Sequence, residues 1–307
     1  MKHSLEQEFA RYLSAKKALD DRSLNRHVYG ALARRLAKQP TSQPLRVLEL
    51  GAGIASMPAR LLEGGLSAPM HYTALDSSPG FVAEASAWLE SWARQWDYAL
   101  QRQSETRFTF SRNYQRLTLE LIQDDLFAFL KRAPQAGWDL LAAHAFLDLI
   151  DLDETLPPLL KLLCPGGLFY FTLNFDGVTV FEPLIDPALD AKITTLYHRN
   201  MDERRVDGRQ AGHSQTGRRL FAALRQAGAQ VLAAGSSDWV VYPADDGYVS
   251  DEGLFLQFIL QFVEDSLSGH PELDAGQLVD WLAQRRRQVD EGTLVFIAHQ
   301  IDLLGTI

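Results

Sequence analysis

From Leu45 onward the sequence alternates short apolar runs with longer segments of helical periodicity. Short apolar runs bounded by turn residues are typical of buried strands, and parallel strands need long, usually helical, connections. The alternation therefore predicts a parallel sheet with helices on its faces. The expected strands cover residues 45–50, 71–75, 117–122, 140–143 and 168–173, followed by extended runs at 230–234, continuing toward 239–242, and at 294–301.

Helical patterns fill most of the remaining chain. They cover residues 3–38, 55–64, 79–103, 125–132, 153–163, 214–227, 252–267 and 277–288. A proline-rich linker, Gln39–Pro44, separates the first helical segment from the first strand. Two segments are too long for simple crossovers, the arginine-rich stretch 101–116 and the stretch 175–212. Long connections in compact domains are usually functional or disordered.

Composition narrows the class of protein. The chain has 307 residues and a formal net charge of -9, which argues against a protein that holds nucleic acid or an anionic membrane through its overall field. A single cysteine, Cys164, excludes an internal disulfide and a multi-cysteine metal site. No apolar run approaches the roughly 18 residues of a membrane span. We therefore expect a cytoplasmic enzyme with a large core.

The sharpest local signal lies between Val47 and Ser56, where an apolar strand leads through Gly51-Ala52-Gly53 into a helix. Glycine is needed where the backbone bends tightly and a ligand approaches it closely. Asp76 ends the second expected strand, 25 positions after Gly51, where an acid can accept hydrogen bonds from both ribose hydroxyls of a nucleoside. The alternatives are a turn without a ligand and, for Asp76, an N-cap of the next helix.

At this point the sequence resembles the class I S-adenosylmethionine-dependent methyltransferases. The resemblance spans about residues 45–174, and more loosely the two late strands. Its motifs are Glu49–Gly53, Asp76, Gln123–Leu126, Trp138–Leu141 and Leu163–Leu168. One departure is Ala55, where many members carry another small residue or glycine. A nicotinamide-binding fold fits less well, because Ser56 stands where that fold wants glycine or alanine.

The resemblance implies a Rossmann-like three-layer α/β sandwich. Its sheet is expected to have seven mostly parallel strands, with the last strand antiparallel. The implied domains are an N-terminal helical cap, 1–40, and a methyltransferase domain, 41–307. That domain would contain an inserted lid or acceptor segment at about 175–212 and a helical insertion at about 250–290.

The resemblance also implies a cofactor, S-adenosyl-L-methionine, and a site for it. Gly51 and Gly53 would let the backbone meet the methionine part of the cofactor, and Glu49 would face its ammonium group. Asp76 would hold the ribose hydroxyls.

The resemblance also implies that the adenine contacts come from the residues after the third expected strand. Asp125 would accept from the adenine amino group, with the Leu126 amide nearby. Asp124 is the less favoured acid, because the family's acid usually directly precedes the apolar residue. Either carboxylate could instead cap the helix that follows. His144, after the fourth strand, is a candidate general base or a histidine packed at the cofactor edge.

The acceptor pocket is expected beyond the carboxyl ends of the strands. The arginines of the 175–212 segment have two interpretations. Paired arginines recognise carboxylates and phosphates, which would favour an anionic acceptor. They could instead belong to a solvated helix with mutual ion pairs. A magnesium site at Asn174 and Asp176, as in some catechol-type methyltransferases, is not favoured, and no metal is expected. The candidate pocket residues are Asp148, Asn174, Tyr197, His198, Arg199 and Arg205.

The leading hypothesis is methyl transfer to an oxygen or nitrogen atom of a small-molecule acceptor, by in-line displacement with positioning and a histidine base. The alternatives are an RNA or protein methyltransferase that uses the 101–116 stretch, and a cofactor-binding partner subunit without catalysis. A nicotinamide dehydrogenase ranks last. The expected partner is a small molecule, with no membrane and no nucleic acid, and the chain is expected to be a monomer or a homodimer.

Overall fold

A large mixed sheet organises the computed structural model of the chain, which describes residues 2–38, 43–66, 68–206 and 208–307, with side chains from Glu8 onward. The strands are β1 (Leu45–Leu50), β2 (Met70–Asp76), β3 (Ala99–Arg102), β4 (Arg107–Arg112), β5 (Gln115–Gln123), β6 (Trp138–His144), β7 (Leu163–Glu182), β10 (Gln230–Ser236), β11 (Trp239–Val241) and β12 (Val295–Thr306). A separate two-stranded hairpin joins β8 (Arg205–Val206) to β9 (Arg209–Gln210).

The strand order in the large sheet is β10-β12-β7-β6-β1-β2-β5-β4-β3, with β11 paired to β12. The pairs β1–β2, β1–β6, β2–β5 and β6–β7 are parallel. The last strand, β12, runs antiparallel to both β7 and β10. The predicted fold class is therefore confirmed, with one difference in number. The described residues form ten strands in this sheet, because β3, β4 and β11 join the seven that were expected.

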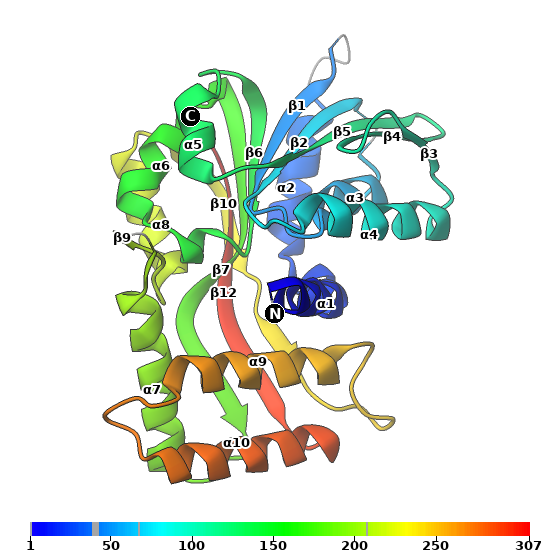
Figure 1. The fold of residues 1–307 in the computed structure, drawn as a ribbon. Coiled ribbons are helices and arrows are strands. Elements are labelled where there is room, and N and C mark those ends of the chain that lie inside the picture. Colours follow the sequence, from blue (N-terminus) through cyan, green and yellow to red (C-terminus); the bar gives the residue numbers. More distant parts are fainter. Residues whose placement is uncertain (1, 39–42, 67, 207) are drawn as a thin grey trace.

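Helices cover both faces of the sheet, as Figure 1 shows. On one face lie α5 (Leu126–Arg132), α6 (Leu152–Leu160) and α8 (Thr216–Gln226), and on the other lie α2 (Arg26–Leu36), α3 (Ser56–Glu63) and α4 (Phe81–Gln95). Within the described parts of the chain, no helix combines the length and the apolar character that a bilayer crossing requires.

The expectation of one helix over 79–103 was wrong. Helix α4 ends at Gln95, and Ala99–Arg102 forms the edge strand β3. Burial of aromatic side chains explains the change, because Trp92 of α4 contacts the rings of Tyr98 and Phe110 at centroid distances of 4.9 and 5.9 Å. This packing favours strands over a longer helix. The arginine-rich stretch 101–116 is thus largely the hairpin that links β3, β4 and β5.

Strand β7 is much longer than the expected run 168–173. It spans 20 residues and pairs with β12 along most of its length. In Figure 1 both strands continue past the rest of the sheet, toward α7 (Pro187–Glu203), α9 (Glu252–Leu267) and α10 (Ala275–Asp290). The segment 175–212 therefore contains the end of β7, helix α7 and the β8–β9 hairpin. Its action as a lid stays a prediction.

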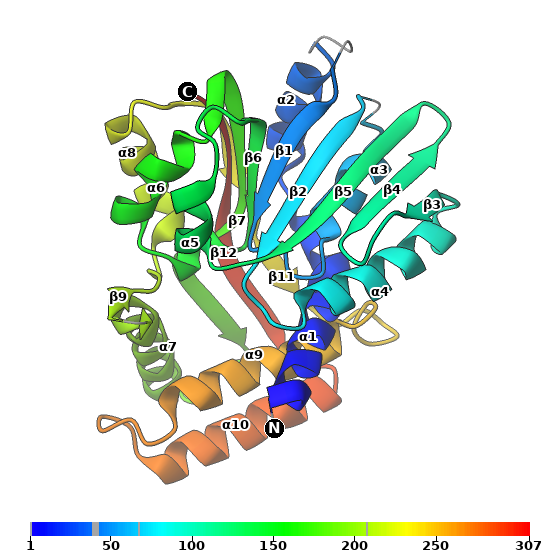
Figure 2. The same cartoon turned by 45° about the horizontal axis from the view of Figure 1, so that its top comes forward.

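The expected N-terminal helical segment is two helices. Helix α1 spans Lys2–Ser23, and Asn25 accepts the N–H groups of His27 and Val28 to cap α2. Asn25 also donates from its side-chain amide to the Ser236 carbonyl, which holds the junction against β10. Both cartoon views place α1 beside α9, at the end of the sheet where β1 and β2 end (Figures 1 and 2). The domain boundary expected at 40–41 and most of the Gln39–Pro44 linker lie outside the described residues.

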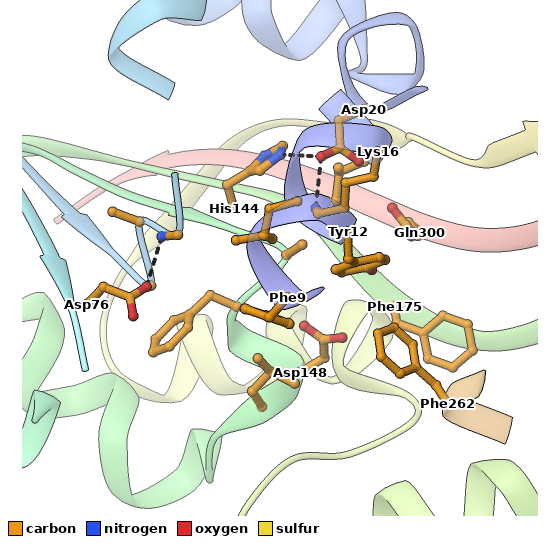
Figure 3. Close-up of a pocket in the computed structure, with 18 of the residues that line it drawn as sticks. Phe9, Tyr12, Lys16, Asp20, Asp76, His144, Asp148, Phe175, Phe262 and Gln300 are labelled. Atoms are coloured by element: carbon orange, nitrogen blue, oxygen red, sulfur yellow. Dashed lines mark hydrogen bonds and ion pairs between the residues drawn. The ribbon is translucent and has the colours of Figure 1, made fainter. Parts of the chain in front are cut away.

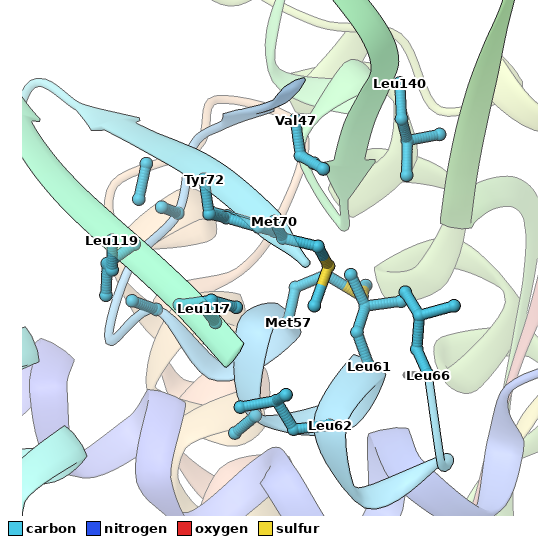
Figure 4. Close-up of a cluster of buried hydrophobic side chains, with 14 of the residues drawn as sticks. Val47, Met57, Leu61, Leu62, Leu66, Met70, Tyr72, Leu117, Leu119 and Leu140 are labelled. Carbon is cyan, nitrogen blue, oxygen red and sulfur yellow. The ribbon is translucent and has the colours of Figure 1, made fainter. Parts of the chain in front are cut away.

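A continuous apolar cluster fills the space between the sheet and α3 (Figure 4). Met57, Leu61 and Leu62 project from α3 toward residues of β1, β2 and β5. The sheet contributes Leu119, which is 0% exposed. Close packing of such side chains means that a removed methylene group leaves a cavity.

We expect Leu119→Ala to lower the free energy of unfolding by about 2–5 kcal/mol, the usual range for a buried leucine. Val279→Ala is the control, because Val279 is 62% exposed on α10 and should change stability by less than about 0.5 kcal/mol. Urea denaturation of both variants measures the difference. Equal effects of the two substitutions would contradict this placement of the core.

Candidate functional site

A cavity of about 680 Å³ lies at the carboxyl ends of the parallel strands. Its wall includes the end of β1 and the turn after it, Asp76 at the end of β2, and His144 at the end of β6. Helix α1 contributes Phe9, Tyr12, Leu13, Lys16 and Asp20. In Figure 3, Asp76 lies at one end, and Tyr12, Asp148, Phe175, Phe262 and Gln300 gather toward the other.

The glycine turn has the geometry that its sequence predicts. Gly51 and Gly53 have φ angles of +61° and +56°, in the left-handed region that favours glycine. A Cβ on Gly51 would lie 2.1 Å from the Phe146 ring, and one on Gly53 would lie 2.8 Å from Leu13 of α1. Both positions therefore require glycine, and in this structure the side chains of Phe146 and Leu13, which line the cavity, lie directly against the backbone of the turn.

Asp76 connects this turn to the end of β2. One carboxylate oxygen accepts the Gly53 N–H at 2.8 Å, and the other accepts the Ser78 N–H at 2.9 Å. Each carboxylate oxygen has more than one lone pair. The side chain therefore stabilises the turn and, because it lines the cavity, can still accept hydrogen bonds from a ligand.

Glu49 is a buried carboxyl group that reaches the cavity wall. Its oxygen accepts the Tyr72 hydroxyl at 2.9 Å. Burial raises the pKa of Glu49 to about 8, although the Tyr72 hydrogen bond and the Arg60 charge act in the opposite direction. A cation bound beside Glu49 would favour its ionised form.

Asp124 and Asp125, the two acids that follow β5, have different roles. Asp125 is the N-cap of α5, where its carboxylate accepts the Ala128 N–H at 2.9 Å. Asp124 lines the cavity, forms an ion pair with Arg132 and accepts the Asp125 N–H. The structure thus places Asp124, and not the favoured Asp125, on the wall together with Leu126.

Both ring nitrogens of His144 are engaged with other side chains. Nε2 lies 2.8 Å from Arg60 Nη1, and Nδ1 lies 2.8 Å from Thr172 Oγ1. Burial and the nearby Arg60 charge lower the pKa of His144 to about 3. The ring is therefore neutral, accepts from Arg60 and donates to Thr172, so that neither nitrogen is available to take a proton from an acceptor.

Asp20 is the centre of this buried network. It receives the Lys16 ammonium at 2.8 Å and the Trp239 indole N–H at 2.9 Å, and it lies 3.5 Å from Arg60. Burial would raise the pKa of Asp20, but the charges of Lys16 and Arg60 hold it well below its usual range. Four elements, α1, α3, β6 and β11, thus meet at one carboxylate.

Aromatic residues surround the far end of the cavity. Tyr12 packs edge-to-face against Phe262 at 5.0 Å, Phe175 lies at this end in Figure 3, and Tyr197 and Trp239 also line the cavity. Asp148 follows β6, and burial raises its pKa to about 6. Arg204, which is not among the candidate pocket residues given above, lines the cavity close to Asp148 and Tyr197.

Four of the predicted pocket residues do not line the cavity. Asn174 donates its side-chain amide to the Ile301 carbonyl, and His198 lies 2.9 Å from Thr179 Oγ1. Arg199 pairs with Glu272, and Arg205 is exposed and donates to the Gly208 carbonyl. Asn174 and Arg199 contact Ile301 and Glu272, residues far along the chain that sequence spacing does not relate to them.

The wall residues of α1 were missed by the sequence analysis. Tyr12, Lys16 and Asp20 follow one another at intervals of four residues, so they share one face of a helix. The sequence did contain a signal for this wall, because a lysine and an aspartate share one helix face with aromatic side chains. Among the described residues, no group of three or more His, Cys, Asp or Glu side chains is arranged to hold a metal ion. Asp176, considered for such a site, is paired with Arg218.

No protein-family model matches this sequence, and no curated protein sequence is similar to it. Solved structures give weak likenesses. A methyltransferase from Mesorhizobium loti is 16% identical, with coverage of 90% of this chain and 96% of the other and a TM-score of 0.41. A methyltransferase from Thiobacillus denitrificans, solved with S-adenosylhomocysteine, is 15% identical, with coverage of 91% and 92% and a TM-score of 0.43.

A cyclopropane synthase from Mycobacterium tuberculosis is 10% identical, with coverage of 91% and 84% and a TM-score of 0.45. Identities and TM-scores of this size do not indicate what this chain binds.

Glu49 makes the stability of the ligand-free protein depend on pH. Its pKa is about 8 in the folded protein, against an ordinary value of 4.5 in water, so the folded state binds an extra proton between these values and stability falls as pH rises through them. Glu49→Gln has no such group. We expect its free energy of unfolding, relative to that of the natural protein, to rise by up to a few kcal/mol between pH 5 and pH 8.5, since one pKa unit corresponds to about 1.4 kcal/mol.

Urea unfolding of both proteins at the two pH values makes this comparison. Tyr72 keeps an acceptor in the glutamine variant, so the substitution isolates the charge. A constant difference between the two proteins across this range would contradict the raised pKa.

Proposed function

We propose that this chain transfers a methyl group from S-adenosylmethionine to an oxygen or nitrogen atom of a small-molecule acceptor. The observation that carries the proposal is one continuous cavity with two chemically different ends. One end has a glycine turn and carboxylates at the strand ends, and the other has aromatic walls. In open parallel sheets, ligands bind beyond the carboxyl ends of the strands, where this cavity lies.

The residues at the glycine end suit an adenosyl amino acid. Glu49 is a buried carboxyl group that a ligand ammonium would stabilise as a carboxylate. Asp76 offers acceptor oxygens to ribose hydroxyls, and Asp124 offers them to an adenine amino group. Gly51 and Gly53 leave their backbone open to close approach once Phe146 and Leu13 move aside.

When bound, S-adenosylmethionine supplies a methyl group on a sulfonium, whose carbon–sulfur bond breaks as an electron pair of the acceptor forms the new bond to carbon. The protein's part in such a displacement is alignment and exclusion of water. Helix α1 performs the second task, because Tyr12, Leu13 and Lys16 form part of the cavity wall. In this proposal His144 is a positioning residue and not a base, since Arg60 and Thr172 engage its ring nitrogens.

The placement of the arginine-rich hairpin argues against a macromolecular acceptor. No residue of β3 or β4 lines the cavity, and the exposed Arg102, Arg107 and Arg112 lie on the sheet edge formed by these strands. The apolar side chains of the cavity wall also suit a small molecule better than they suit the charged backbone of a nucleic acid.

Asp76→Asn tests the cofactor site. We expect it to weaken S-adenosylhomocysteine binding by one to two orders of magnitude, because hydrogen bonds to a charged group contribute on the order of 1.5–3 kcal/mol. Asp125→Asn is the matched control. It removes a nearby carboxylate that caps α5 and does not line the cavity, so its affinity should match that of the natural protein.

Isothermal titration calorimetry of the three proteins with S-adenosylhomocysteine gives the affinities, and circular dichroism verifies that the variants are folded. If folded Asp76→Asn binds as tightly as the natural protein, the assignment of the ribose site is wrong. If the natural protein binds NAD or ATP but not S-adenosylhomocysteine, the proposed function is wrong.

A further inference from the structure

Two buried acceptor oxygens in the cavity wall have no donor within the described part of the chain. They are Asp148 Oδ1 and Gln300 Oε1. Gln300 is only 2% exposed, and both residues line the cavity, from a short helix after β6 and from β12. An unpaired buried polar group costs about 1–3 kcal/mol. A ligand that brings hydrogen-bond donors to this end therefore has a specific advantage.

The cations near these oxygens, Lys16 and Arg204, both bond to acceptors within the protein. The Lys16 ammonium bonds to Asp20 at 2.8 Å and lies over the rings of Tyr12 and Trp239, 6.0 and 5.5 Å from their centroids. Arg204 is exposed and donates from Nε to the Ala211 carbonyl. A ligand anion at this end would meet the Asp148 carboxylate without a free buried cation to offset it.

The aromatic walls favour the opposite charge. Tyr12, Phe175 and Phe262 lie toward the same end of the cavity as Asp148 in Figure 3, and Tyr197 also lines the cavity. The faces of aromatic rings attract cations, and the attraction strengthens when water is excluded. Nearby charge of opposite sign also favours the ionised form of a carboxyl group whose pKa burial has raised.

We propose that the methyl acceptor is an amine on an apolar or aromatic body, with its N–H groups donating to Asp148 and Gln300. The inference rests on the proposed function, which makes this end of the cavity the acceptor site. An ammonium group has two or three donors and a positive charge, so it can donate to both oxygens and pair with Asp148. Before transfer one of its protons passes to the Asp148 carboxylate, which frees the nitrogen lone pair that bonds to the methyl carbon as the carbon–sulfur bond breaks and S-adenosylhomocysteine leaves. An alcohol has one donor and no charge, and it leaves one of the two oxygens unpaired.

Three probes that share one ring and differ in one polar group test this inference: benzylamine, benzyl alcohol and benzoate. Calorimetry on the full chain, with and without saturating S-adenosylhomocysteine, should show benzylamine binding at least tenfold more tightly than the other two. Asp148→Asn should weaken benzylamine binding at least tenfold, and Gln300→Leu should weaken it several-fold. Neither should change the affinity for S-adenosylhomocysteine.

Asp153→Asn is the matched control, because it removes an exposed carboxylate five residues further along the chain, where Asp153 pairs with Arg219. It should bind benzylamine as the natural protein does. If a variant fails to fold, the preference of the natural protein among the three probes decides alone. Benzoate or benzyl alcohol binding as tightly as benzylamine overturns the inference, and so does the absence of benzylamine binding at millimolar concentration.

The two proposals fail in different ways. Amine binding without S-adenosylhomocysteine binding would refute the proposed function and leave the amine site intact. S-adenosylhomocysteine binding without a preference for the amine would refute only the amine site.

Discussion

The buried carboxylate of Asp20 is the contact on which the arrangement of the cavity depends. Lys16, Arg60, His144 and Trp239 meet it from α1, α3, β6 and β11. A buried charge is stable only when its partners are held in place, and removal of one partner is strongly destabilising. The network therefore fixes α1 against the carboxyl ends of the strands, where this helix becomes a wall of the cavity.

That constraint has chemical consequences at both ends of the cavity. Arg60 and Thr172 occupy the His144 ring, so the one histidine in the wall serves the architecture and not proton transfer. Lys16 is likewise directed at Asp20, and among the described residues of the cavity wall Asp148 Oδ1 and Gln300 Oε1 remain as buried oxygens without a donor. Charge pairing inside the protein thus determines which polar groups remain for a ligand.

The sequence was most informative where local chemistry decides the structure. The apolar run 45–50 became β1, and the glycines after it adopt the positive φ angles that a tight turn requires. Asp76 lies at the end of β2, as its position after an apolar run predicts. The arrangement of the sheet could therefore be inferred, although the roles of the residues in its site stay predictions.

The rest depends on contacts between residues far apart in the chain. Asp20 and His144 are separated by 124 positions, and no spacing rule links them. The β3 and β4 strands form because Trp92, Tyr98 and Phe110 pack together, which overrides the helical pattern of 79–103. The sequence favoured Asp125 over Asp124 on the wall, although both can cap a helix, and only the folded contacts show that Asp125 caps α5 while Asp124 lines the cavity.

A crystal structure of the protein with S-adenosylhomocysteine tests the central claim most directly. The account predicts the ribose at Asp76, the amino acid part beside Glu49 and Gly51, and the sulfur facing the end of the cavity that contains Asp148. Density for the ligand with its adenosine among Tyr12, Phe175 and Phe262, or density outside this cavity, would contradict it.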